Sequence, residues 1–160
     1  MLSAPPLIVL PTEKDYQNYY TNEFCRKAVF TADSLRVYFS PNRFWHAFCT
    51  RDHNGKKDKF SIERAQYIGW IKPTLGNPNA LLLQGWNADL EVYEPHRRVN
   101  IVFESFIVVI EIQLAQNQSV KASFITAYYA DKSINKIKKS PKWSHTECLE
   151  YLTTKKPKGR

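Results

Sequence analysis

The hydrophobic pattern of the chain changes its period once, near residue 80, and this change restricts the possible folds more than any other feature. Before that point, apolar side chains recur at steps of three and four, which is the period of a helix with one buried face. After it, apolar and polar side chains alternate, which is typical of strands with one buried face. The sequence therefore predicts an α+β fold in which N-terminal helices come first and an antiparallel sheet follows.

The first half is predicted to hold three helices, a short strand and a polar surface loop. Thr12 is a suitable N-cap for the first helix, and Pro41 suits the first turn of the second. Gly76 and Pro78 supply a stop signal for the third helix. The predicted ranges are helices at residues 13–30, 41–49 and 61–75, a strand at 35–39 and the loop at 50–59.

The second half is predicted to form a four-stranded antiparallel meander and then a short basic helix. The breaks between the strands are too short for the crossovers that parallel pairing needs. One join, Glu104-Ser105, must be a tight turn although neither residue favours hairpins. The predicted ranges are strands at residues 80–86, 99–103, 106–114 and 120–128, and the basic helix at 131–139. We expect one domain over residues 1–152 and a frayed basic tail over 153–160.

The composition excludes several classes of protein. The chain has 160 residues, enough to bury a core without a disulfide or a metal. Its three cysteines are odd in number and far apart, and its four histidines lack ligand spacing, so the sequence predicts neither a metal site nor a cofactor. No apolar run approaches the 20 or so residues of a membrane helix, and the first residues do not resemble a signal peptide. These observations predict a cytoplasmic protein without membrane contact.

The net charge of +8 is concentrated at one end of the chain. Residues 131–160 carry nine Lys or Arg against three Asp or Glu, whereas the rest of the chain is close to neutral. Such a cationic segment indicates a phosphate-rich partner, because lysine and arginine release condensed counterions when they meet a nucleic-acid backbone. A solvated tail that only aids solubility would have the same composition.

Four side chains are candidates for chemistry, and each also has an ordinary structural interpretation. His46 lies in an aromatic helix and suits acid–base work, or is a satisfied core histidine. Thr126 and Tyr128 share the polar end of an otherwise apolar strand face, which is typical of a site mouth or of the rim of a core. Arg64 is placed to bind a phosphate or to form a surface ion pair. The candidate nucleic-acid contacts are Arg97, Arg98, Lys132, Lys136, Lys138 and Lys139.

The combination of these features resembles the barnase–EndoU–colicin–RelE superfamily of small metal-independent ribonucleases, and in particular its phage-borne and toxin-associated domains. The resemblance covers about residues 40–140. It is carried by FSIERA and IGWI in the third predicted helix, by Asn77-Pro78 before a strand, and by the strand segments FIVVI and FITAY, at residues 60–65, 68–71, 106–110 and 124–128. The superfamily places helices before a four-stranded antiparallel sheet, which agrees with the order predicted from periodicity.

The resemblance implies an endoribonuclease that cleaves RNA, with tRNA and rRNA as candidate substrates, through attack of the 2′-hydroxyl on the adjacent phosphorus. His46 would transfer the proton, with His53 as its rival, and Arg64 would stabilise the charged intermediate. Thr126 would donate to a phosphate oxygen, and Tyr128 would position the ribose or stack on a base. The resemblance also implies an acidic antitoxin or immunity protein as a partner. The alternative is a non-catalytic nucleic-acid-binding or protein-interaction module that uses the same basic face.

Overall fold

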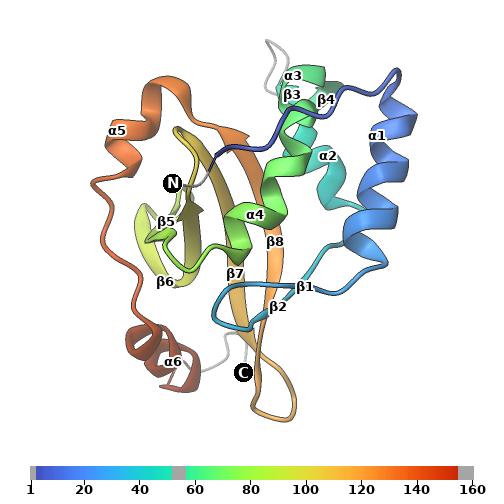
Figure 1. Cartoon of the computed structure of the whole chain (residues 1–160). Helices are drawn as coiled ribbons and strands as arrows, with labels where there is room; N and C mark the ends of the chain where they lie inside the picture. The colour runs from blue at the N-terminus through green and yellow to red at the C-terminus, as the bar shows by residue number, and fades with distance from the viewer. Residues whose placement is uncertain (1–2, 52–56, 155–160) are drawn as a thin grey trace.

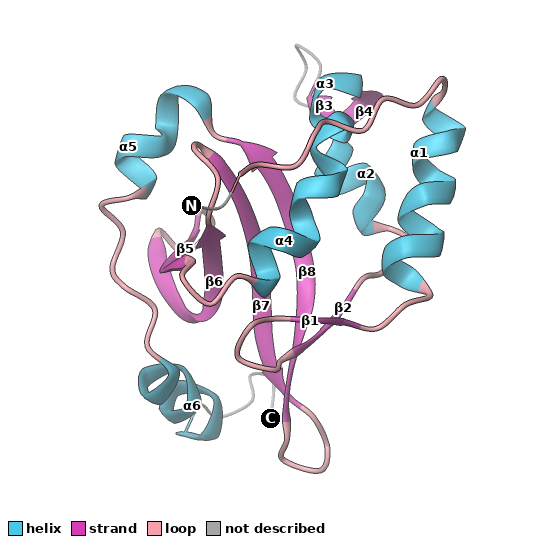
Figure 2. Ribbon diagram, in the orientation of Figure 1, coloured by secondary structure: helices cyan, strands magenta, loops and turns pink. Residues whose placement is uncertain are grey.

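The computed structural model describes residues 3–51 and 57–154 and shows a mixed α+β fold (Figures 1 and 2). The helical elements are α1 (Glu13–Tyr20), the π-helix η1 (Thr21–Cys25), α2 (Arg43–Phe48), α3 (Ile62–Ala65), the 3-10 helix η2 (Gln66–Trp70), α4 (Ile71–Gly76), the 3-10 helix η3 (Asp131–Ser133), α5 (Ile134–Ile137) and α6 (His145–Thr154). The strands are β1 (Val29–Phe30), β2 (Arg36–Tyr38), β3 (Cys49–Arg51), β4 (Lys57–Phe60), β5 (Leu81–Asn87), β6 (Val92–Ile101), β7 (Phe106–Leu114) and β8 (Val120–Tyr129).

The described strands form a six-stranded sheet in the order β1-β2-β8-β7-β6-β5, and a separate hairpin of β3 and β4. The strands from β5 to β8 pair antiparallel with their sequence neighbours. The sheet is larger than the predicted four-stranded one, because β1 and β2 extend it beyond β8, and β2 pairs with β8 in parallel. The loop predicted at 50–59 contains the β3–β4 hairpin, in which Cys49 lies opposite Phe60. His53 lies outside the described residues.

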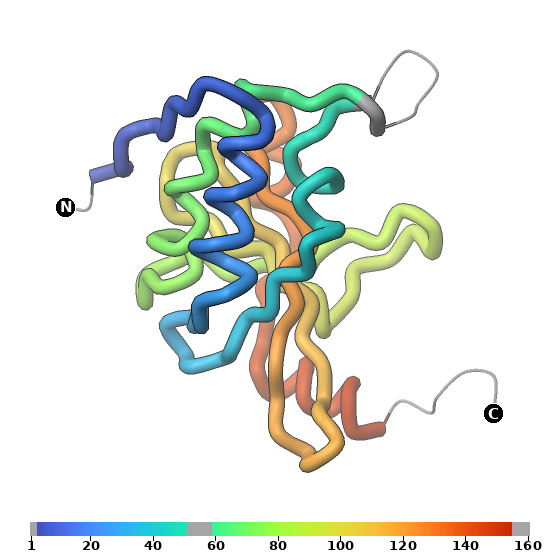
Figure 3. The backbone as a smooth tube through the Cα atoms, turned by 90° about the vertical axis from the view of Figure 1, so that its right-hand side faces the viewer, coloured from blue at the N-terminus to red at the C-terminus, as the bar shows by residue number. Residues whose placement is uncertain are grey.

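Two irregularities bend the sheet where the candidate site lies. Gln84 pairs with Arg98 and Gly85 with Glu94, so residues 95–97 of β6 have no register partner on β5. The strand β6 thus begins at Val92, well before the strand predicted at 99–103, because the bulge interrupts the pairing without ending the strand. A second bulge separates Val109 from Ile110 in the pairing of β7 with β8. In Figure 3 the tip of the β5–β6 hairpin projects away from the side of the sheet that carries α1.

The helices of the first half are shorter and more broken than the sequence predicts. A capping box between Thr12 and Asp15 starts α1, and the π-helix η1 ends at Cys25 instead of Phe30, which belongs to β1. The predicted third helix consists of α3, η2 and α4 in succession. In the part of the chain that is described, no helix is long and apolar enough to cross a membrane.

The helices of the first half cover one face of the sheet with an aromatic core. Tyr20 is at its centre, with ring centroids 5.6 Å from Phe44, 6.3 Å from Phe48 and 6.5 Å from Phe124. The Tyr20 hydroxyl donates to the carbonyl oxygen of Ser40 at 2.7 Å, and burial raises its pKa. Such large buried rings contribute much of the hydrophobic stabilisation of a domain of this size. We call this surface of the sheet the helical face.

The opposite surface, which we call the open face, is covered less completely. It buries a smaller aliphatic cluster: Leu83, Val99, Ile101, Ile107, Val109 and Ala130. Ile134 and Ile137 of α5 pack on this cluster, so α5 covers part of the open face. The predicted basic helix is the short η3–α5 segment. A C-terminal helix that the sequence analysis missed, α6, follows it and contains no lysine or arginine; it includes Thr153 and Thr154, and the remaining tail lies outside the described residues.

Candidate active site

Two elements, β2 and α2, lie along the edge of β8, and α2 carries His46 to that edge. The strand β2 pairs with β8 only at Ala122 and Ser123, and α2 packs against β8 as well. The helix α2 buries Phe44, Ala47 and Phe48 in the aromatic core. His46 is half-buried and lines a cavity on the open face together with residues of β8.

This cavity, of about 310 Å³, brings together three of the four residues predicted to be catalytic. His46 comes from α2, and Thr126 and Tyr128 come from β8. Aliphatic side chains from the open face line it as well, and the remaining lining residues are Gln84, Gly85, Trp86, Arg97, Ile137 and Ser140. We refer to it as the candidate active-site cavity.

Thr126 contributes a hydroxyl without a partner to this cavity. It is paired with Val109, which belongs to the aliphatic cluster of the open face, so both residues point to that face. Its Oγ1 is buried and has no hydrogen-bond partner among the described residues. A buried hydroxyl left in this state costs about 1–3 kcal/mol, which a ligand that accepts or donates a hydrogen bond would recover.

Arg97 brings a positive charge to the cavity, a placement that its basic character alone does not reveal. Its aliphatic stem lies on Gly85, where a Cβ atom would overlap with Cγ and Cδ of the arginine. One terminal nitrogen donates to the carbonyl oxygen of Trp86 at 3.1 Å, while the buried Nε has no partner among the described residues. The sequence signal that could have indicated this placement is Gly85, because a glycine inside a strand often marks a bulge or a close approach of another group.

Arg64 lies behind Tyr128 rather than in the candidate active-site cavity. Its Nε donates to the carbonyl oxygen of Ala47 at 2.9 Å, and its Cζ lies 5.4 Å from the centroid of the Tyr128 ring. It lines a neighbouring cavity of about 460 Å³, which Tyr128 also borders. Burial lowers the pKa of Arg64 and raises the pKa of Tyr128, although the nearby guanidinium opposes the second shift. Arg64 therefore contacts the Tyr128 ring but does not line the candidate active-site cavity.

The neighbouring Arg98 does not face solvent, and this corrects its prediction as a nucleic-acid contact. It is only 1% exposed, and its two terminal nitrogens donate to the Asp33 carboxylate at 2.8 and 3.2 Å. Its Nε donates to Asn100 at 3.1 Å, and its Cζ lies 4.7 Å from the Trp143 ring centroid. Alternation along β6 explains why Arg98 is buried while Arg97 lines the cavity, because consecutive residues point to opposite faces of a sheet.

The four predicted lysine contacts are all exposed: Lys132 and Lys136 on the η3–α5 segment, and Lys138 and Lys139 directly after it. The apolar side of this segment packs on the open face through Ile134 and Ile137, and Ile137 also lines the candidate active-site cavity. The lysines therefore lie on or directly after the segment that borders the cavity. Their charges give the surface beside the cavity a positive potential.

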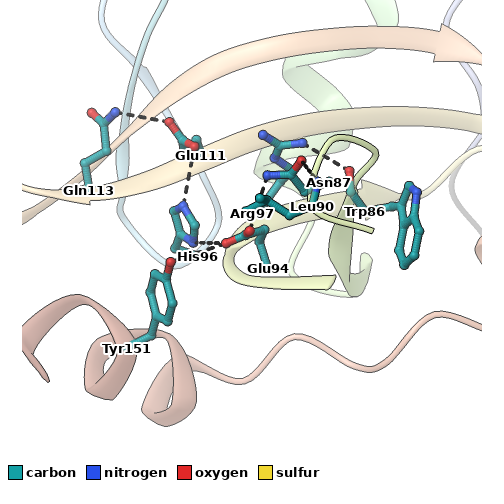
Figure 4. A network of polar contacts seen from close by, with 9 residues as sticks. All are labelled: Trp86, Asn87, Leu90, Glu94, His96, Arg97, Glu111, Gln113 and Tyr151. Atoms are coloured by element: carbon teal, nitrogen blue, oxygen red, sulfur yellow. Dashed lines mark hydrogen bonds and ion pairs between the residues drawn. The ribbon is translucent and has the colours of Figure 1, made fainter. Parts of the chain in front are cut away.

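A buried polar network adjoins the site and connects α6 to the sheet (Figure 4). The imidazole of His96 lies between two carboxylates, with Nδ1 3.3 Å from Glu94 and Nε2 3.4 Å from Glu111. The Tyr151 ring stacks on His96 with a centroid distance of 4.7 Å. A hydrogen bond from His96 holds the pKa of Glu111 below its usual range despite desolvation, and Gln113 also donates to Glu111.

Within residues 3–51 and 57–154, no group of three or more His, Cys, Asp or Glu side chains is gathered closely enough to hold a metal ion. A scan against protein-family models, a search of curated proteins and a search of solved structures each gave no match.

Proposed function

We propose that this protein is an endoribonuclease that cleaves RNA through the ribose 2′-hydroxyl and does not require a metal ion. The observation that carries the proposal is the convergence of His46, Arg97, Thr126 and Tyr128 around one cavity. An imidazole, a guanidinium and two hydroxyls are the groups that proton transfer and stabilisation of a phosphate need.

In the proposed reaction, the 2′-oxygen attacks the adjacent phosphorus and the bond from phosphorus to the 5′-oxygen breaks. His46 accepts the 2′-hydroxyl proton, and water supplies the proton that the leaving 5′-oxygen takes up. The products are a 2′,3′-cyclic phosphate and a 5′-hydroxyl. DNA binds but does not react, because it lacks the 2′-hydroxyl.

The other residues stabilise or orient the reacting groups. Arg97 binds the phosphate oxygens as negative charge develops on them, a role that the sequence analysis assigned to Arg64. The Thr126 hydroxyl donates to the same phosphate, which satisfies a group that is otherwise unpartnered. Tyr128 contacts the ribose or a base, and Arg64 is a positioning residue that holds the Tyr128 ring from behind.

The same geometry supports two further parts of the proposal. The exposed lysines on and directly after the η3–α5 segment attract the RNA backbone toward the cavity, with tRNA and rRNA as candidate substrates. An acidic antitoxin or immunity protein would be complementary to the same basic surroundings. With RNA as substrate, the protein would act in the cytoplasm.

The proposal is tested by incubating the full chain with RNA in the presence of EDTA and analysing the product ends. We expect 2′,3′-cyclic phosphate ends, and we expect His46→Ala to slow cleavage by roughly 10²–10⁴-fold. The matched control is His145→Ala, which removes an exposed imidazole on α6 outside the cavity and should leave the rate unchanged. Full activity of His46→Ala would contradict the proposal. RNA binding without any cleavage by the parent chain would favour the non-catalytic module.

A further inference from the structure

A second and larger hollow adjoins the candidate active-site cavity. It has a volume of about 550 Å³, and His46 and Ile125 line both hollows. Its basic side chains are Lys27, Arg36, Arg43 and His46. We call this hollow the basic groove. None of the sequence-based site predictions except His46 falls in it.

The charges of the basic groove favour an anion. Among the described residues, neither Arg36 nor Arg43 forms an ion pair with a carboxylate, and the buried Nε of Arg36 has no hydrogen-bond partner. Lys27 is paired with Glu23 at 3.0 Å outside the groove lining. The one carboxylate in the lining, Glu111, already contacts His96 and Gln113.

The groove also carries an exposed aromatic ring with two cations close to it. Tyr38 is 47% exposed, and Arg36 lies over its ring with Cζ 4.7 Å from the centroid. The Nζ atom of Lys121 approaches the same ring to 5.6 Å. Rings combined with cations in this way are typical of surfaces that bind single-stranded nucleic acids, because any base can stack on the ring while the cations meet the phosphates.

We propose that the basic groove binds a single-stranded segment of the RNA substrate and that Tyr38 stacks on one of its bases. This inference rests on the proposed function, since the groove leads to the cavity in which cleavage would occur. It adds the substrate class: unpaired RNA is bound in preference to duplex RNA, because bases inside an A-form helix cannot stack on a protein ring. Trp86 is 49% exposed and lines the candidate active-site cavity but not the basic groove, so it offers a second ring for stacking.

The test measures binding without cleavage. The probe is a fluorescein-labelled 12-nucleotide RNA with 2′-O-methyl groups, used as a single strand and as a duplex, and affinity is measured by fluorescence anisotropy. We expect the single strand to bind at least roughly fivefold more tightly than the duplex, and Tyr38→Ala to weaken single-strand binding by roughly fivefold to a hundredfold. Tyr38→Phe is the matched control, because it keeps the ring and should keep the affinity.

A second measurement examines the charges independently of stacking. Arg43→Ala should lower the log–log slope of affinity against salt by about 0.7 for one lost phosphate contact. The control is Lys14→Ala, which removes the same charge from the first turn of α1, outside the groove lining. It should leave the slope unchanged. Equal affinities of Tyr38→Ala and Tyr38→Phe, or equal binding of duplex and single strand, would overturn the inference. If the parent chain cleaves no RNA but these binding differences persist, the proposed function fails and the groove assignment stands.

Discussion

Phe124 and Thr126 lie two positions apart on β8, yet they belong to surfaces that are packed in different ways. Phe124 is 1% exposed and lies among the aromatic rings of the helical face, with its centroid 4.7 Å from that of Phe39. Thr126 lies on the open face and has a hydroxyl without a described partner. The bulge beside them, between Val109 and Ile110 of the facing strand, lets β8 serve both surfaces.

The same contrast separates Arg97 from Arg98 on β6. Arg98 is held by a carboxylate, an amide and an indole ring, whereas Arg97 donates to a backbone oxygen, has a buried Nε without a described partner, and borders a cavity. One face of the sheet therefore carries the packing that stabilises the fold, and the other keeps polar groups available. Unsatisfied groups are tolerated on the open face because the helical face supplies the stability that they cost.

The largest expected effect contrasts the two β8 residues. Phe124→Ala should lower the free energy of unfolding by about 3–5 kcal/mol, because it leaves a cavity in the aromatic core. Thr126→Val should change it by less than about 1 kcal/mol, because the lost hydroxyl has no partner, while cleavage slows. Urea denaturation measures both variants. A loss of more than about 2 kcal/mol in Thr126→Val would show that the hydroxyl contributes to the fold.

The two arginines give the next largest contrast. Arg98→Ala should destabilise the protein by about 2–3 kcal/mol, because it removes a buried guanidinium that is paired with a half-exposed carboxylate and packs against Trp143. Arg97→Ala should cost less than about 1 kcal/mol in stability but slow RNA cleavage by roughly 10²–10³-fold. Thermal unfolding and initial cleavage rates, measured on the same preparations, separate the two effects. Equal destabilisation by both variants would remove the distinction between the faces.

A smaller effect is expected at Gly85, which supports the stem of Arg97. Gly85→Ala would push the arginine aside, and we expect a stability loss of about 1 kcal/mol together with slower cleavage. Gly76→Ala is the matched control, because a Cβ there meets nothing within 4 Å, and it should leave cleavage unchanged. Denaturation curves and cleavage rates of both variants provide the comparison. Normal cleavage by Gly85→Ala would mean that Arg97 does not need its present position.

Much of the sheet could be predicted because its signal is local. Alternation is kept through β7, whose two sides pack in the two different clusters, and the Glu104 turn forms with φ of 42° and a 2.8 Å bond from the Phe106 amide to the Phe103 carbonyl oxygen. In β8 the bulge interrupts the alternation, so the prediction that Thr126 and Tyr128 end the same strand face as Phe124 was wrong. The strand β6 was shortened in the prediction because Pro95 and the bulge interrupt the alternation. The helix α6 was missed because Cys148 is its only buried residue, which leaves little periodic signal.

The site could be predicted only in part, because its geometry is not local. His46 and Thr126 were identified from their neighbours in sequence, but their approach depends on α2 packing along the edge of β8. The different surroundings of Arg97 and Arg98 could not be predicted, since the partner of Arg98 is Asp33, 65 residues away. Arg36 and Tyr38 lie in a strand of three residues whose neighbour in the sheet, β8, begins more than 80 residues later.

The smallest expected effect concerns the pH dependence of the helical face. Burial alone would raise the pKa of Asp33, but hydrogen bonds from Arg98 and Thr31 outweigh it and hold the pKa below its usual range. The stability from this ion pair is therefore fully present above the unfolded value of about 3.9 and is lost as the pH falls through the lower folded value.

Asp33→Asn should therefore flatten the decrease in stability below about pH 4, with an amplitude smaller than the other effects because the carboxylate side chain is 44% exposed. Chemical denaturation between pH 2 and 7 measures this slope. In an Arg98→Ala background, the same substitution should flatten the slope much less, because the guanidinium that lowers the pKa is gone. An equal change in both backgrounds would show that Asp33 titrates independently of Arg98, and the ion pair would then contribute nothing to the stability of the helical face.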